Sequence, residues 1–98
     1  MILVRDVFQL KFGKAKEAKA LWKEATAIRE RSGPQSLRAL VDLTGPYYTF
    51  VMESTYEDLS AFEKSLKDTM SKAEFGNWYQ KFVSLVESGK REIYTVVD

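Results

Sequence analysis

The sequence contains neither cysteine nor histidine. Without cysteine no disulfide framework can form, and nothing in the composition points to secretion. Without histidine, a zinc site of the usual kind and a serine triad with an imidazole base are both excluded. The carboxylates of Asp6, Asp42 and Glu53 follow no ligand spacing of a metal site. We therefore expect no metal and no cofactor.

A strong charge of one sign is also missing. The 15 basic residues nearly balance the 14 acidic ones, which leaves a formal net charge of +1. A general binder of nucleic acids or anionic membranes needs a large positive field, so we expect neither partner. Lys16, Lys19 and Lys23 are interleaved with Glu17 and Glu24, which is typical of a solvated helix face.

Long hydrophobic runs are absent too. The N-terminal segment 1–8 is apolar, but the charges of Arg5 and Asp6 interrupt it. It is too short and too charged for a signal peptide or a membrane span, so we expect a cytoplasmic location. A chain of 98 residues corresponds to a single domain, residues 1–98.

The apolar residues that are present recur with two periods. Period two predicts strands and a period near 3.6 predicts helices. The predicted strands cover residues 2–11, 36–44, 47–53 and 90–97, and the predicted helices cover 14–31, 54–70 and 71–89. Gly45-Pro46 predicts a two-residue type II′ turn between the second and third strands. Ser-x-x-Glu capping boxes at Ser54 and Ser71 predict two separate helices, with Gly89 ending the second.

This βαββααβ order leaves few folds open. Strands two and three pair as a hairpin, and crossover connections are right-handed. The arrangement that follows is an α+β, ferredoxin-like fold: an antiparallel four-stranded sheet in the order 4-1-3-2 with the helices on one face. The residues expected to face the helices are Phe8, Leu10, Val41, Leu43, Phe50 and Met52.

The second face of the predicted sheet mixes apolar and charged residues. It is too apolar for a solvated face and too polar for a closed core, so we expect it to meet the sheet of a second copy in a homodimer. Its charged residues are expected to form ion pairs at this interface rather than a catalytic set. The candidate interface residues are Arg5, Arg38, Leu40, Asp42, Tyr47, Val51 and Glu53.

The layout resembles a known superfamily. The features that carry the likeness are the opening strand that leads into a Trp-bearing helix (Leu10-Lys11-Phe12-Gly13 to Trp22), the hairpin over 37–53, and the aromatic segment Asn77-Trp78-Tyr79. Together they resemble the dimeric α+β barrel superfamily, which includes antibiotic-biosynthesis monooxygenases and NIPSNAP-like proteins. The likeness to NIPSNAP-like proteins is the nearer one. It implies two sheets paired as a barrel and a small ligand held between sheet and helices.

The resemblance also implies where a ligand would lie. The haem-binding members usually supply a histidine, which this chain lacks. Cofactor-independent members oxidise a bound aromatic molecule, and Asn77 and Trp78 most resemble their pocket residues. The candidate pocket residues are Asp6, Trp22, Tyr48, Asn77, Trp78 and Tyr94. The alternative is that these aromatic residues form the core and that the chain is a non-catalytic homodimeric module, so enzymatic activity stays open.

Asp6 is the odd residue of the first strand, since its neighbours at the same parity are apolar. An unpaired carboxylate in an apolar setting is costly. We expect either that a β-bulge re-aims Asp6 or that it is buried beside a partner.

Overall fold

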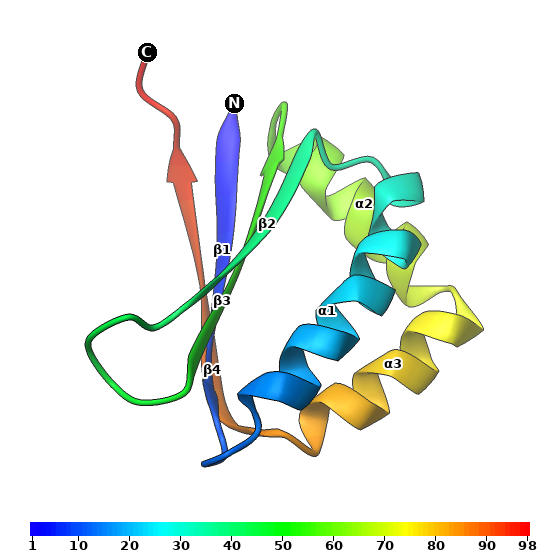
Figure 1. Cartoon of the computed structure of the whole chain (residues 1–98). Coiled ribbons are helices and arrows are strands. Elements are labelled where there is room, and N and C mark those ends of the chain that lie inside the picture. Colours follow the sequence, from blue (N-terminus) through cyan, green and yellow to red (C-terminus); the bar gives the residue numbers. More distant parts are fainter.

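A computed structural model of the chain describes residues 1–98, apart from the side chain of Ser32. The elements are β1 (Ile2–Leu10), α1 (Ala15–Arg29), a short 3₁₀ turn η1 (Glu30–Ser32), β2 (Ser36–Val41), β3 (Thr49–Tyr56), α2 (Leu59–Met70), α3 (Ala73–Val83) and β4 (Val86–Thr95). The strands form one antiparallel sheet in the order β2-β3-β1-β4. All helices cover the same face of it (Figure 1). The predicted order and the predicted ferredoxin-like layers are confirmed.

The main core lies between the sheet and the α1–α3 pair. Leu10, Phe50 and Met52 meet Trp78 and Phe82 there. The small residues Ala18 and Ala25 of α1 are fully buried in the same cluster, which lets this helix approach the sheet closely. A smaller cluster of Val4, Tyr56 and Phe62 lies under α2.

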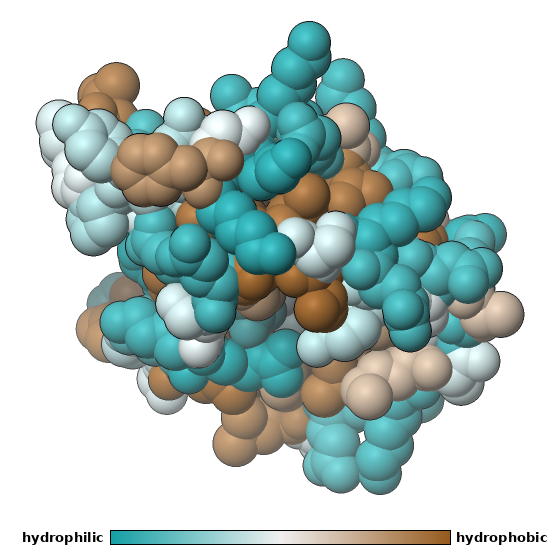
Figure 2. Space-filling model, turned by 90° about the horizontal axis from the view of Figure 1, so that it is seen from below, coloured by the Kyte–Doolittle hydropathy of each residue, from teal (hydrophilic) through white to brown (hydrophobic). Residues whose placement is uncertain are grey.

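The core comes close to the surface at one end. Figure 2 looks at the end where β1 runs into α1 and α3 runs into β4, and hydrophobic residues lie in a hollow ringed by hydrophilic ones. An apolar wall that solvent can reach is a common property of ligand sites.

The connection between β2 and β3 is longer than predicted. The two-residue turn is wrong, because the strands stop at Val41 and Thr49 and residues 42–48 form a loop that projects away from the helices (Figure 1). Leu43 is 97% exposed in this loop, and Val41 at the strand end is also exposed. Their predicted place in the core is wrong, because Leu43 lies past the last paired residue and Val41, although paired with Phe50, ends the edge strand β2.

The helix boundaries also differ from the capping boxes. β3 continues to Tyr56, and the N-cap of α2 is Asp58, whose carboxylate accepts a hydrogen bond from the Ala61 N–H at 2.8 Å. The predicted break before the third helix is confirmed, but Ser71 ends α2, and its hydroxyl donates to the Asp68 carbonyl at 2.7 Å. Neither serine is an N-cap, because Ser54 lies inside β3 and Ser71 is the C-cap of α2.

Gly89 does not end a helix. α3 ends at Val83, and Gly89 lies inside β4, directly opposite Phe8 of β1. A Cβ at position 89 would lie 2.8 Å from Phe8 Cδ1, closer than side chains approach. The glycine is therefore needed for this close packing. The strand begins at Val86, earlier than the predicted start at residue 90.

Candidate functional site

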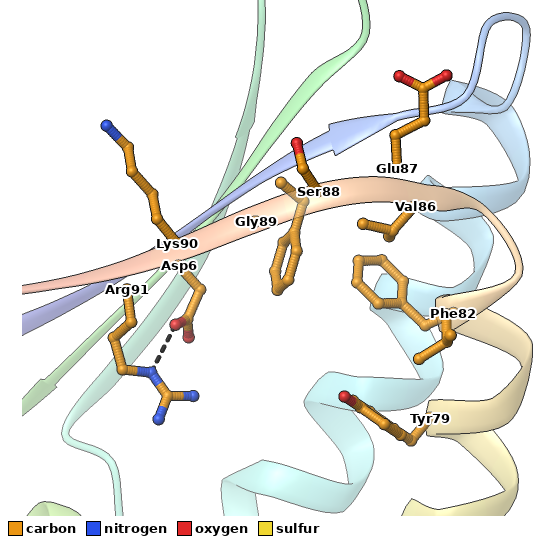
Figure 3. A pocket seen from close by; sticks show the side chains of 11 residues that line it. Asp6, Tyr79, Phe82, Val86, Glu87, Ser88, Gly89, Lys90 and Arg91 are labelled. Carbon is orange, nitrogen blue, oxygen red and sulfur yellow. Dashed lines mark hydrogen bonds and ion pairs between the residues drawn. The ribbon is translucent and has the colours of Figure 1, made fainter.

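A groove of about 490 Å³ lies between α3 and β4. Its lining includes Asp6, Phe8, Tyr79, Phe82, Val86 and Arg91 (Figure 3). Successive residues of β4 point to opposite faces of the sheet, so Arg91 points toward the groove whereas Lys90 and Ser88 point away from it. The groove therefore draws one wall from the helix and the other from the sheet.

The polar end of the groove is the ion pair between Asp6 and Arg91. The two residues are directly opposite each other on β1 and β4, and the Arg91 Nε donates to the Asp6 Oδ1 at 2.7 Å. Asp6 is buried, and the Arg91 guanidinium also lies 5.3 Å from the centre of the Phe62 ring. Of the two expectations for Asp6, a buried carboxylate with a partner is the one observed. The β1–β4 irregularity lies elsewhere, between Gln9 and Leu10.

Arg91 keeps part of its hydrogen-bonding capacity free. Its Nε is used by Asp6, and among the described residues no side chain or carbonyl accepts a hydrogen bond from its two Nη atoms. In Figure 3 this end of the guanidinium points away from β4, toward the side of the groove where the Tyr79 ring lies. A guanidinium held in this way can bind an acceptor with two parallel N–H groups.

The rest of the groove is largely apolar, although Glu87, Ser88 and Lys90 also border it along β4. Phe8 and Phe82 meet edge to face, with ring centroids 4.9 Å apart. Val83 and Val86 continue this wall, and Val83 remains about half exposed. Tyr79 is 54% exposed, so its hydroxyl is available to a ligand. Aromatic walls with a few converging polar groups are what small-molecule sites commonly show.

The six residues predicted to line a pocket do not surround one space. Asp6 alone lines this groove. Trp78 is buried in the core, where its indole stacks on Phe82 at 5.0 Å and donates to the Leu21 carbonyl at 2.6 Å. Trp22 packs half-buried near Phe50. Both tryptophans thus hold the core together.

The remaining three candidates lie on other surfaces. Asn77 is exposed and, together with Trp78, borders a separate hollow between α1 and α3. Tyr48 is the last residue of the β2–β3 loop, has a φ of 59° and packs beside Phe12, with ring centroids 5.0 Å apart. Tyr94 is opposite Leu3 on β4, on the sheet face that points away from Asp6 and Arg91.

Sequence reasoning missed Arg91 and Phe82 as groove residues. Phe82 contacts the core, and it also borders the groove. The sequence does contain a hint of Arg91. A carboxylate inside an apolar strand needs a basic partner, and the last strand offers Lys90 and Arg91. Only the register decides between them, since it places Arg91 opposite Asp6.

The outer face of the sheet, turned away from the helices, carries most of the predicted interface residues. Arg5, Arg38, Leu40, Val51 and Glu53 all lie on it. The other two predicted residues belong to the β2–β3 connection. The Asp42 carboxylate accepts from the Thr49 N–H at 3.0 Å, and Tyr47 is exposed beside Phe12.

Four charges of alternating sign form a row across this outer face. From β2 to β4 the row, which we call the charge row, runs Arg38, Glu53, Arg5, Glu92. The successive N–O distances are 2.6, 3.6 and 3.8 Å. Glu53 is buried between its two arginines, whereas Arg38 is largely exposed. Arg5, Arg38 and Glu53, which were expected to pair between subunits, thus also form ion pairs within one chain.

A family model for NIPSNAP matches residues 5–98, which is nearly the whole chain. The chain belongs to the NIPSNAP family. The resemblance seen in the sequence is thus confirmed. No protein with a curated description matches this NIPSNAP sequence.

Solved structures share its fold. An uncharacterized NIPSNAP domain protein from Burkholderia xenovorans matches with a TM-score of 0.89 at 14% identity, over 99% of this chain and 95% of that one. A NIPSNAP family protein from Agrobacterium tumefaciens matches with a TM-score of 0.90 at 19% identity, over 99% and 93%. SnoaB, a cofactor-independent oxygenase from Streptomyces nogalater, matches with a TM-score of 0.78 at 15% identity, over 99% and 93%. At these identities the likeness establishes the fold alone.

Two further properties concern the described residues of the NIPSNAP chain. None of its helices is both long and apolar enough to cross a bilayer. No group of three or more acidic side chains in the described part gathers in a way that could hold a metal ion.

Proposed function

We propose that the groove between α3 and β4 binds a small molecule with an apolar, ring-shaped body. The observation that carries this proposal is the combination of an open apolar wall with a buried, paired Asp6 at one end. The wall of Phe8, Phe82 and Val86 offers ring faces and edges, which favour flat apolar ligands. The fold is shared with a cofactor-independent oxygenase, which supports a small-molecule role in general.

The proposal concerns binding of the small molecule and does not extend to its oxidation. Asn77 and Trp78, the residues put forward for an oxidation, both border a different hollow, and Trp78 also belongs to the core. A molecule bound in the groove would instead meet Tyr79 and the Asp6–Arg91 pair.

Binding is testable with a neutral bicyclic probe. We expect 2-naphthol to show saturation-transfer NMR signals with the wild-type chain and a dissociation constant of about 1 mM or lower, given its size. Val83→Trp fills the groove and is expected to abolish the signals. Val97→Trp is the matched control, because Val97 is exposed at the C-terminal end and does not line the groove. Equal signals from both variants would place the probe elsewhere.

A second candidate function is assembly: the chain as a homodimeric module joined through the outer face. The charge row is the observation that favours it. Because the signs alternate, a two-fold axis parallel to the strands reverses the row, and each charge then faces its opposite in the second copy. Arg38 of one protomer would face Glu92 of its partner. A two-fold axis across the strands would instead oppose like charges, so the row specifies one arrangement.

Apolar residues beside the row add to this surface. Leu40 and Tyr94 are 40% and 49% exposed on the outer face, one near each edge of the sheet. Burying them against a second sheet would remove apolar area from water. Analytical ultracentrifugation over about 1–100 µM tests the assembly, since micromolar affinities are common for interfaces of modest size. A dimer is expected, and a monomer throughout would contradict the module.

A further inference from the structure

We infer that Arg91 binds a carboxylate on the ligand, so that the groove is a site for aromatic carboxylic acids. The inference rests on the proposed small-molecule site and names the chemical class it takes. It begins from the state of Arg91, which lines the groove and whose Nε is occupied by Asp6, while its two Nη atoms have no acceptor among the described residues. The unoccupied edge of the guanidinium presents two parallel N–H donors, which match the two oxygens of a carboxylate.

Arg91 is held in place before any ligand arrives. Asp6 fixes the guanidinium from one side, and the ring of Phe62 lies against it at 5.3 Å. A long flexible side chain loses rotamer freedom when it binds an anion, and a side chain that is already fixed loses less. This pairing therefore serves recognition as well as stability.

The charge of the groove end selects among anions. Asp6 cancels one positive charge, so the pair is close to neutral before a ligand binds. A doubly charged phosphate would be repelled by the buried Asp6 carboxylate, whereas a singly charged carboxylate adds only one negative charge. Lys90 and Glu87 do not alter this balance much, because their side chains point to the other face of the sheet (Figure 3).

The apolar walls determine what carries the carboxylate. From Arg91 the groove continues along Phe8 and Phe82 to Val86, with the Tyr79 ring opposite. A flat aromatic ring fits between these side chains, and a volume of about 490 Å³ leaves room for two fused rings. The Tyr79 hydroxyl can donate to a second acceptor on such a ring.

The test compares two probes of nearly the same size and shape, the anion 2-naphthoate and its neutral amide 2-naphthamide, by NMR titration of the ¹⁵N-labelled chain. We expect the wild-type chain to bind the carboxylate about tenfold more tightly than the amide, because charge-assisted hydrogen bonds are the stronger ones. Arg91→Gln is expected to remove this preference, because it weakens binding of the carboxylate more than binding of the amide. Lys90→Gln removes the same charge from the outer face and is expected to keep the preference.

The outcomes separate this inference from the proposal beneath it. If the wild-type chain binds both probes equally, the carboxylate assignment is overturned while the groove remains a ligand site. If Arg91→Gln and Lys90→Gln reduce the preference equally, the effect is one of overall charge and the assignment to Arg91 fails. If neither probe binds, the proposed function itself falls. The two-probe comparison on the wild-type chain needs no variant to fold.

Discussion

Asp6 of β1 and Arg91 of β4 are joined by a hydrogen bond of 2.7 Å across directly opposed positions of the two strands. The bond places a buried carboxylate and a half-exposed guanidinium at the end of the α3–β4 groove. It links the stability of the sheet edge to the chemistry of the groove, because a change in either residue affects both.

Loss of the arginine should destabilise the chain measurably. Arg91→Met leaves the buried Asp6 carboxylate without its partner, and we expect the free energy of unfolding to fall by about 1–3 kcal/mol. Lys90→Met is the control, because the Lys90–Glu92 pair at 3.4 Å is largely exposed and should be worth less than about 0.5 kcal/mol. Urea denaturation of both variants measures the difference. Equal losses would mean that Asp6 does not depend on Arg91.

Gly89 offers a test of packing at the groove wall. Gly89→Ala puts a methyl group 2.8 Å from a carbon of the Phe8 ring, so the ring must shift, and we expect a loss of about 1–3 kcal/mol in stability. Gly76→Ala is the matched substitution in α3, where a Cβ meets nothing within 4 Å. It should stabilise the chain by about 0.4–1 kcal/mol, because alanine favours the helix. Thermal unfolding of both variants gives the signs, and a neutral Gly89→Ala would show that Phe8 adapts freely.

The charge row predicts how a dimer responds to charge reversal. Arg38→Glu and Glu92→Arg each create two like-charge contacts in the proposed homodimer, and each should raise its dissociation constant about tenfold or more. An equimolar mixture of the two variants pairs opposite charges at both contacts again, so sedimentation should show a restored dimer. A mixture of Arg38→Glu with the wild-type chain is the control and should stay weaker. If the two-variant mixture dissociates as readily as its components, the proposed arrangement is wrong.

The sequence predicts most of this fold because strand and helix periods are distinct along it. The strand order, the helical layer and the break between α2 and α3 all follow from alternation and chain order. The errors fall where a local signal has two meanings. Leu43 continues an apolar pattern into a solvent-exposed loop, and Gly89 looks like a helix end although its role is to admit the Phe8 ring.

The site was harder to predict than the fold. The aromatic residues that draw attention in the sequence, such as Trp22 and Trp78, are the ones that fill the core. The groove depends instead on register, which brings Arg91 opposite Asp6 and turns Lys90 away. Register is decided by the packing of whole strands, so a single sequence reveals the need for a partner to Asp6 but not its identity.

The most direct test of the central claim is a map of amide chemical shifts on the ¹⁵N-labelled chain during a titration with 2-naphthol. A ligand site in the α3–β4 groove predicts saturable shifts confined to the groove, centred on Phe82, Val83, Val86 and Gly89. Shifts centred on the outer face, or no saturable shift up to about 5 mM, well above the affinity expected for a probe of this size, would contradict it.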